Sequence, residues 1–329
     1  MHRFPFPVAW VVLAIGCGPP EVAGPDWMEP VTPTPAPARA PPRLHVDGTT
    51  LRTPAGAEVR LRGVNVCSLE FDQAGANWQP QPDGGSTTLD VLAARDRWRV
   101  NAVRMPINQE WLLTDDAYLS RVESLIDAAA LRGVYVILDV QWEHGERTEP
   151  YQLNILKRPT FGFGNTTEAL WHLAAGRWSN RDNLLFDVIN EPHDVTPSEL
   201  SIDMQRMVDR LAQRAPQTLV VVGGPDWAHS VDWWRLHPLK SANVVYSAHE
   251  YLPYDPPSSF DEHFVRPAQT LPVLVAEFGP DQDQLIDTAE TAGVDGWMPW
   301  AIGCGLSLDA DLDGGVEQTL AARLRDLSP

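Results

Sequence analysis

The sequence lacks the short motifs that mark several common enzyme classes. Its 329 residues contain no His-Glu-x-x-His, no Cys-x-x-Cys, no Gly-x-Ser-x-Gly and no phosphate-binding glycine loop. These absences leave a zinc peptidase, a thiol redox protein, a serine hydrolase and a nucleotide-binding enzyme without support. We therefore expect neither a bound metal nor an organic cofactor.

Basic residues are also scarce, with 25 Lys and Arg against 44 Asp and Glu and a formal net charge of -19. A net charge of this sign opposes binding to nucleic acid and to anionic membrane surfaces. A neutral ligand suits it better, and the 13 tryptophans supply flat apolar rings that suit sugar faces as well as protein cores. We expect a monomer that binds a neutral ligand.

The apolar run near the amino terminus is short, covering residues 8–15 between the basic start His2-Arg3 and Gly16-Cys17. A membrane-spanning helix needs roughly 20 apolar residues, whereas the core of an export signal is this short. Residues 13–17, Leu-Ala-Ile-Gly-Cys, resemble a bacterial lipoprotein cleavage site, at which Cys17 is acylated and becomes the new amino terminus. An ordinary signal peptide with an incidental cysteine is the alternative.

Residues 18–42 contain nine of the 30 prolines, mixed with Ala, Thr and Glu. Such a segment cannot bury a core and favours extended conformations, so we predict a disordered, semi-rigid linker. The remainder, residues 43–329, is predicted to be one catalytic domain. We expect an extracytoplasmic protein, either secreted or touching the membrane only through a lipid anchor.

From residue 44 onward the composition predicts alternating strands and helices. Residues 44–60 predict a small hairpin with a turn at Pro54-Ala55-Gly56. Apolar runs then predict eight strands, at residues 59–64, 101–105, 134–140, 184–189, 219–222, 244–247, 273–276 and 296–302. Helical signals lie between them, such as the capping pattern Thr196-Pro197-Ser198-Glu199.

Eight strand–helix units predict an α/β fold of the closed (β/α)8 TIM barrel type, with its active site at the carboxyl ends of the strands. An open doubly wound sheet would call for a glycine-rich loop after the first strand, which residues 62–65 do not provide. Cys67 and Cys304 follow the first and last predicted strands, which are neighbours in a closed barrel. A disulfide between them and a pair of buried free thiols both remain open.

Polar side chains stand at the predicted strand ends, where a barrel brings them to one centre. In chain order these residues are Arg104, Gln141, Trp142, Asn190, Glu191, His249, Tyr251, Glu277 and Trp300. Taken singly, each has a structural explanation: an arginine is often an ion pair, a histidine often part of the core and a tryptophan often barrel packing. Their coincidence at successive strand ends favours a catalytic site.

Two glutamates facing each other suit the cleavage of a glycosidic bond, in which one protonates the leaving oxygen and the other attacks or activates water. We predict that Arg104 keeps Glu277 ionised as the nucleophile, and that repulsion from Glu277 keeps Glu191 protonated as the acid. Tyr251 is expected to orient Glu277, and His249 to tune Glu191. Asn190 would bond a sugar 2-hydroxyl, and Trp300 would stack beneath the ring.

With these motifs the chain resembles glycoside hydrolase family 5, the cellulase-like retaining enzymes, over Leu44 to Leu327. The resemblance is carried by residues 61–65 (Leu-Arg-Gly-Val-Asn), 101–106 (Asn-Ala-Val-Arg-Met-Pro), 190–192 (Asn-Glu-Pro), 249–251 (His-Glu-Tyr) and 277–279 (Glu-Phe-Gly). It implies that Glu191 is the acid/base and Glu277 the nucleophile. The family commonly has His where this chain has Gln141, which can bond a hydroxyl but cannot carry charge.

The sequence therefore predicts an exported, endo-acting retaining hydrolase of a β-linked polysaccharide, with β-1,4-glucan as the favoured substrate. β-Mannan and β-1,3-glucan are the alternatives within the same chemistry. From a different class, a surface polysaccharide-binding protein on an inactive barrel remains possible because of Gln141.

Overall fold

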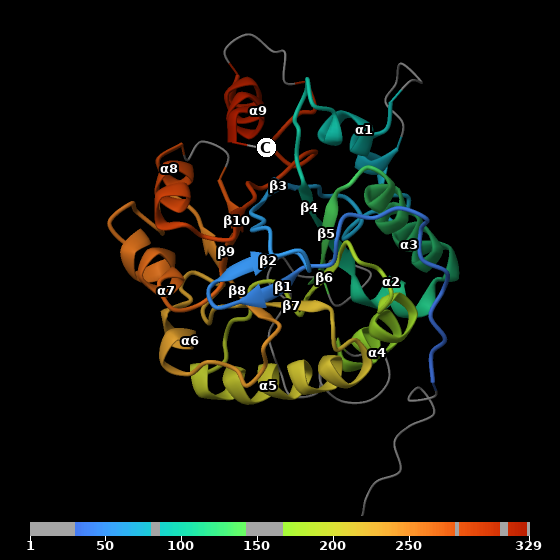
Figure 1. Ribbon diagram of the computed structural model, residues 1–329, viewed down its shortest axis with the longest axis horizontal. Helices are drawn as coiled ribbons and strands as arrows, with labels where there is room; N and C mark the ends of the chain where they lie inside the picture. The colour runs from blue at the N-terminus through green and yellow to red at the C-terminus, as the bar shows by residue number, and fades with distance from the viewer. Residues whose placement is uncertain (1–29, 80–85, 143–166, 280–282, 310–314, 328–329) are drawn as a thin grey trace, which may run out of the picture.

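The computed structural model describes residues 30–79, 86–142, 167–279, 283–309 and 315–327. Eight parallel strands close into a barrel in the order β10-β3-β4-β5-β6-β7-β8-β9, and helices surround them on the outside (Figure 1). The predicted TIM barrel is therefore confirmed. Its strands are β3 (Leu61–Asn65), β4 (Ala102–Asn108), β5 (Tyr135–Trp142), β6 (Leu184–Asp187), β7 (Leu219–Gly223), β8 (Val244–Glu250), β9 (Val273–Phe278) and β10 (Gly296–Trp297).

The helices follow the strands in the predicted alternation. The capping pattern at Thr196 is confirmed, because its side chain accepts from the backbone N–H of Glu199 while the Glu199 carboxylate accepts from the backbone N–H of Thr196.

Within the described ranges, none of the helices combines the length and apolar content needed to cross a membrane. They are α1 (Thr88–Ala93), α2 (Gln109–Thr114), α3 (Asp116–Leu131), α4 (Thr167–Trp178), α5 (Pro197–Arg214), α6 (Asp232–Leu236), α7 (Arg266–Ala268), α8 (Asp283–Ala292) and α9 (Val316–Leu327), with short turns η2 (Ala76–Trp78) and η4 (Asp261–Val265).

The eighth strand is much shorter than predicted. β10 covers only two residues, and the chain leaves the ladder near Pro299, which has no N–H to donate. It returns at Ile302, which bridges to Val66. At the closure point Gly296 is required, because a Cβ there would lie 2.0 Å from the carbonyl oxygen of Leu61.

The predicted hairpin is present but turns elsewhere. β1 (His45–Asp47) and β2 (Thr50–Arg52) are antiparallel and are joined by two residues, the first being Gly48 with φ of 66°. The turn predicted at residues 54–56 is a second one, after which Glu58 pairs with Arg52. In Figure 1 the hairpin lies across the end of the barrel.

Inside the barrel, side chains form two layers because every second residue of a strand points inward. The lower layer is apolar and includes Leu61, Ala102, Ile137 and Leu185, with Leu51 of the hairpin packed against it. Two positions further along β4, β5 and β6, the side chains are those of Arg104, Asp139 and Asp187. The hairpin therefore plugs the amino-terminal end with apolar contacts, and the carboxyl-terminal end is left to a polar site.

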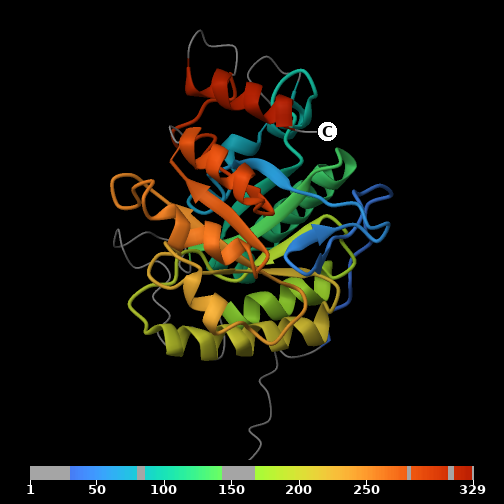
Figure 2. The same cartoon turned by 60° about the vertical axis from the view of Figure 1, so that its left-hand side comes forward.

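A second and larger apolar cluster lies between the barrel and its helices. Trp171 of α4 packs on Phe186 of β6 with ring centroids 5.0 Å apart, and Trp234 of α6 stacks on Tyr246 of β8 at 5.7 Å. Figure 2 shows α4 and α5 side by side along one flank of the strands. Several of the tryptophans are thus core residues, as large apolar rings usually are.

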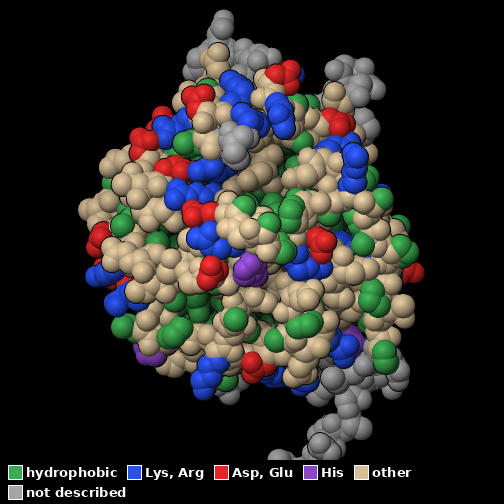
Figure 3. All heavy atoms as spheres, viewed as in Figure 1, with side chains coloured by type: hydrophobic (Ala, Val, Ile, Leu, Met, Phe, Trp, Pro, Cys, Tyr) green, Lys and Arg blue, Asp and Glu red, His purple; other side chains and the backbone are tan. Residues whose placement is uncertain are grey.

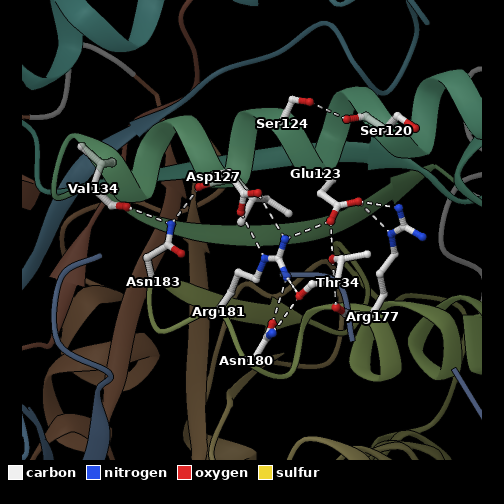
Figure 4. Close-up of polar contacts among 11 residues, drawn as sticks. Thr34, Ser120, Glu123, Ser124, Asp127, Val134, Arg177, Asn180, Arg181 and Asn183 are labelled. Carbon is white, nitrogen blue, oxygen red and sulfur yellow. Dashed lines mark hydrogen bonds and ion pairs between the residues drawn. The ribbon is translucent and has the colours of Figure 1, made fainter. Parts of the chain in front are cut away.

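The described part of the predicted linker packs on the barrel, which corrects the prediction of a disordered segment for residues 30–42. Thr34 accepts hydrogen bonds at its carbonyl from Asn180 (2.7 Å) and Arg181 (2.6 Å), and its hydroxyl donates to Glu123 (Figure 4). Val31 packs against Gly176, because a Cβ added at this glycine would lie 2.5 Å from the Cβ of Val31. The backbone of Thr34 is thus bonded to Arg177 of α4 and to the segment that follows this helix, and its side chain contacts α3. Residues 1–29, with the predicted signal and Cys17, lie outside the described residues.

The end of the barrel that carries the hairpin bears neighbouring charges of both signs (Figure 3). Arg52 pairs with Asp47 at 3.2 Å, and Arg60 pairs with Glu58 at 3.6 Å and Glu290 at 3.2 Å. Pairs this exposed contribute about 1 kcal/mol or less each. They keep this end polar without forming a patch of one sign.

Cys67 and Cys304 are joined by a disulfide, with Cα atoms 6.2 Å apart. It links the segment after β3 to the segment after β10, at the seam where the barrel closes. Because 237 positions separate the two cysteines, the bridge restricts the unfolded chain strongly.

We expect the double variant Cys67→Ser/Cys304→Ser to lose about 3–5 kcal/mol of unfolding free energy, measured by urea denaturation. Thiol titration of the unfolded, unreduced domain from residue 30 should find no free thiol. Two free thiols would contradict the bridge, and Ser68→Ala serves as a control for local disturbance.

Candidate active site

The upper layer of the barrel is built around Arg104, which is fully buried in β4. Its NH1 group donates to Glu277 at 2.9 Å and to Asn65 at 3.2 Å, and its NH2 group donates to Asn190 at 2.9 Å. Its Nε donates to Asp187 at 3.0 Å. The guanidinium thus orients residues from three strands, β3, β6 and β9, and from the turn after β6.

Glu277 lies within β9, where it is almost fully buried. Its Oε2 accepts from Arg104, and its Oε1 accepts from the Tyr251 hydroxyl at 2.6 Å. The predicted orienting role of Tyr251 agrees with this geometry. Both oxygens are therefore held in fixed directions at the carboxyl end of the barrel.

Glu191 stands opposite Glu277 on the segment that follows β6. One carboxyl oxygen of each glutamate and a ring nitrogen of His249 all lie within 4.8 Å of one another. His249 Nδ1 is 3.0 Å from Glu191 Oε1 and 3.7 Å from Glu277 Oε2. The two acids predicted to meet across one saccharide do face each other.

β6 ends at Asp187, two residues earlier than predicted, and the chain then turns sharply to present Glu191. Asn190 N donates to the carbonyl of Val140 at 3.0 Å, which fixes the turn to β5. Glu191 has φ of 44°, in a region that residues other than glycine seldom adopt. A backbone held in this way places the carboxyl group over the barrel mouth, where its side chain keeps 23% exposure.

Burial, more than neighbouring charge, sets the pKa values of the two glutamates. Burial raises the pKa of Glu191 to about 7, and positive charge from Arg104 and His229 opposes this. The prediction that repulsion from Glu277 keeps Glu191 protonated is therefore corrected. Burial also raises the pKa of Glu277, with the negative charge of Glu191 adding to it and Arg104 and Tyr251 opposing it.

His249 is a neutral imidazole at pH 7. Its burial lowers the pKa to about 4, despite the nearby carboxyl of Glu277. It can therefore influence Glu191 through a hydrogen bond but not through a positive charge. The only buried cation among the described residues at the centre of the site is Arg104.

The remaining predicted residues also gather at the mouth. The side-chain oxygen of Gln141 is buried without a hydrogen-bond partner among the described residues. Asn190 accepts at its Oδ1 from Arg104 NH2, so the other contacts of its side-chain amide must be made as a donor. The ring centroids of Trp142 and Phe71 lie 6.0 Å apart. The backbone N–H of Trp300 donates to the carbonyl of Phe278, the residue after Glu277.

Sequence reasoning missed Asn65, Asp139 and Asp187, although all three contact Arg104. Asn65 also donates to the carbonyls of Ala276 and Met298 and so joins the first strand to the last two. The signal was available in the sequence, because an aspartate inside an apolar strand needs a buried partner.

A second polar group lies behind β8, on the side away from Glu277. Asp255 accepts from the backbone N–H of Tyr251 at 2.7 Å and lies 2.8 Å from His229 Nδ1. His263 Nδ1 is 3.2 Å from Glu250 and 3.6 Å from Asp255. Asp255 thereby holds the backbone of the tyrosine that orients Glu277.

Aromatic rings border the site on two sides, and Trp227 was also missed. Its ring stacks on His193 at 4.4 Å with an angle of 4°, and 40% of the residue is exposed. Its backbone N–H donates to the carbonyl of Pro192, directly after Glu191. On the other side Phe71 is 46% exposed. Flat exposed rings on both sides of two carboxyl groups suit the apolar faces of sugars.

Three groups of described residues bring metal-ligating atoms close together, but each already has other contacts. In Cys67, Glu70 and Cys304 the sulfurs form the disulfide. The other two groups are the catalytic-centre set of Glu191, His249 and Glu277 and the set behind β8 of Glu250, Asp255 and His263.

A closed (β/α)8 barrel with two facing glutamates at the carboxyl ends of its strands is the architecture of a glycoside hydrolase. Comparison with known proteins identifies the family. The family model described as "Cellulase (glycosyl hydrolase family 5)" matches residues 53–305. The chain therefore belongs to glycoside hydrolase family 5, as its motifs predicted.

Two relatives illustrate the likeness. Endoglucanase E-5 of Thermobifida fusca is 26% identical over 285 residues, covering 78% of this chain and 55% of the relative. Endoglucanase CelA of Streptomyces lividans is 26% identical over 257 residues, covering 75% of this chain and 50% of the relative. The chain thus spans about half the length of these relatives.

Solved structures share the fold. The catalytic domain of Thermobifida fusca endoglucanase Cel5A superposes with a TM-score of 0.67 at 20% identity, covering 86% of this chain and 97% of that domain. The β-glucanase SdGluc5_26A of Saccharophagus degradans gives 0.69 at 20% identity, covering 92% and 98%.

We expect Arg104→Gln to lower the unfolding free energy by about 3–5 kcal/mol at neutral pH, because it leaves buried carboxylates without their cation. Without the cation, the pKa values of these carboxyls rise further above their unfolded values. The folded state then binds more protons than the unfolded state, so the deficit grows as pH increases. Denaturant unfolding at several pH values measures this, and a deficit that is largest in acid would contradict it.

Proposed function

We propose that this chain hydrolyses a β-1,4-glucan within the polymer, by double displacement with retention of anomeric configuration. The observation that carries the proposal is the approach of the Glu191 and Glu277 carboxyl oxygens to within 4.8 Å. Retaining glycosidases have carboxyl groups about 5–5.5 Å apart, whereas inverting enzymes need roughly 6.5–9.5 Å to admit a water. The short separation favours direct attack by a carboxylate.

The roles follow from the contacts. Glu277 is the nucleophile, because two fixed donors leave it little freedom and stabilise its carboxylate form. Glu191 is the acid and then the base, because burial raises its pKa to about 7, close to the pH at which a proton must be both held and released. In the first step Glu277 bonds to the anomeric carbon while the Glu191 proton passes to the leaving oxygen. In the second, Glu191 takes a proton from the water that releases the sugar.

Asn190 would donate to the hydroxyl next to the anomeric carbon, since its oxygen is already bound by Arg104. Gln141 offers an unpartnered oxygen near the same place, which can accept from a neutral hydroxyl. The rings of Trp142 and Trp300 on one side and Trp227 on the other would carry sugars before and after the cleaved bond. A site that extends on both sides suits action within a chain.

Support for a glucan comes from the relatives, whose names describe endoglucanases. Structures of the Thermobifida fusca domain and of the Saccharophagus degradans β-glucanase contain cellotetraose. β-Mannan and β-1,3-glucan remain the alternatives. Reducing-sugar release from a panel of these polymers, with a fall in viscosity as the sign of internal cleavage, would distinguish them.

We expect Glu277→Ala to lose at least about four orders of magnitude in kcat, and Glu191→Ala about two to four on polymer. Azide should then report each role by the product it forms. With Glu277→Ala it attacks directly and gives the inverted glycosyl azide. With Glu191→Ala and an aryl glycoside that needs no acid, azide intercepts the glycosyl-enzyme and gives the retained product.

Glu262→Ala, on an exposed glutamate of η4, is the control and should match the wild type. A retained glycosyl azide from Glu277→Ala together with an inverted one from Glu191→Ala would exchange the proposed roles. Full polymer activity in either variant would overturn the assignment.

We further propose that residues 1–17 direct export and that Cys17 is acylated. The described chain runs onto the barrel along α3 and α4, and Pro42 accepts at its carbonyl from the Tyr135 hydroxyl at 2.7 Å. Tyr135 begins β5, so this is the end of the barrel opposite Glu191 and Glu277. A lipid tether attached here would leave the catalytic face directed away from the membrane.

In a bacterial host that processes lipoproteins, we expect the wild type in the membrane fraction and Cys17→Ser in the soluble exported fraction. Catalytic activity should be equal in the two, because Cys17 lies far along the chain from the barrel. Unchanged membrane association of the variant would contradict acylation at this residue.

A further inference from the structure

Two aspartates lie side by side beneath the catalytic layer. Strands β5 and β6 pair in parallel with Asp139 opposite Asp187, and neighbouring strands are about 4.8 Å apart. Both side chains reach the same guanidinium, that of Arg104, at 2.9 and 3.0 Å. Their exposure is 0% and 2%, so bulk water does not screen them.

The two carboxyl groups are not equivalent. Asp187 accepts a hydrogen bond from Arg104 Nε. Asp139 has its Oδ1 near Arg104 NH2, but neither of its oxygens accepts a hydrogen bond from the described residues. The NH2 group donates to Asn190 instead. A carboxylate buried without aligned donors is costly, whereas a neutral carboxyl in the same place is much less so.

The charges around this pair do not balance if every acid is ionised. Arg104 is one cation, and it faces three carboxyl groups: Asp139, Asp187 and Glu277. Burial keeps His249 neutral at pH 7, with its pKa lowered to about 4. The other titratable group that acts on the pair is an acid, Glu70. Two uncompensated negative charges would then remain in the interior, and carboxyls that share a site relieve this by retaining a proton.

We propose that Asp139 and Asp187 hold one proton between them, resting on Asp139, and that Arg104 thereby keeps enough positive charge to stabilise Glu277 as a carboxylate. Asp139 and Asp187 are positioning residues, since they act through Arg104 and not on the sugar. The consequence for Glu277 rests on its proposed role as nucleophile. The proton itself does not, so the two can be tested separately.

Infrared spectroscopy detects the proton directly, because a protonated carboxyl group and a carboxylate absorb at different frequencies. We expect wild-type protein with 13C-labelled aspartate to show an isotope-shifted carboxylic band at about pH 8.5. Among the described residues, the other aspartate with a raised pKa is Asp295; burial raises its pKa to about 7, so it is almost fully ionised at pH 8.5. Labelling aspartate alone leaves the bands of Glu70, Glu191 and Glu250 unshifted.

The band should vanish in Asp139→Asn and also in Asp187→Asn, because either change removes the like charge that makes the proton necessary. Asp209→Asn, on the exposed side of α5, should leave it unchanged. No labelled carboxylic band in the wild type would overturn the proposal. So would a band that persists in either single variant, since the proton would then belong elsewhere.

The pH profile of kcat/KM gives an independent reading. Its acid limb follows the ionisation of Glu277, and removing a negative charge nearby lowers the pKa of this carboxyl group. Each single Asn variant still has one negative charge in the pair, so we expect the acid limb to stay in place. The double variant has none, and its acid limb should move to lower pH by about one unit or more.

A shift to lower pH in each single variant would mean that both aspartates are ionised in the wild type and would overturn the proposal. Should the double variant fail to fold, the wild-type infrared band and the single variants still decide the question. If no polymer is cleaved at all, the proposed function fails while the infrared result stands by itself.

Discussion

The ion-paired guanidinium of Arg104 is the constraint on which the site depends. A buried cation must be matched by acceptors, and here hydrogen-bond acceptors come from strands β3, β6 and β9 and from the turn after β6. Asp139 of β5 adds a charge contact at 2.9 Å. Each acceptor is in turn held in one direction by the shared donor. The nucleophile candidate Glu277 and the amide of Asn190 are therefore positioned by the same planar group.

The barrel makes this arrangement possible by separating apolar and polar layers. The lower layer, closed by Leu51 of the hairpin, excludes water from below, and the outer helices exclude it from the sides. A dry interior strengthens every electrostatic contact above it. It also explains why burial dominates the pKa values of Glu191 and Glu277: the same enclosure that fixes these groups makes their charged forms expensive.

The two ends of the molecule serve different purposes. The amino-terminal end of the barrel receives the hairpin and residues 30–42, whose contacts with Glu123, Arg177 and Arg181 attach the incoming chain to α3 and α4. The carboxyl-terminal end bears the acids, the aromatic rim and the disulfide at the seam. The incoming chain and the candidate active site therefore occupy opposite ends of the barrel.

The amino-acid sequence by itself determined the fold class and the family, and it identified the two glutamates, Glu191 and Glu277, that the fold brings together. Short apolar runs alternating with amphipathic helices are local signals, and a strand end that reads Asn190-Glu191 is visible in one stretch of chain. Contacts between segments far apart in the chain decided the rest. Asp139 and Asp187 look like ordinary strand residues until the register of β5 and β6 sets them opposite each other beside Arg104. Residues 30–42 find partners only where the fold brings α3 and α4 together. Burial, which sets the protonation of Glu191, arises from the whole enclosure and so could not be read from the neighbours of that residue in the chain.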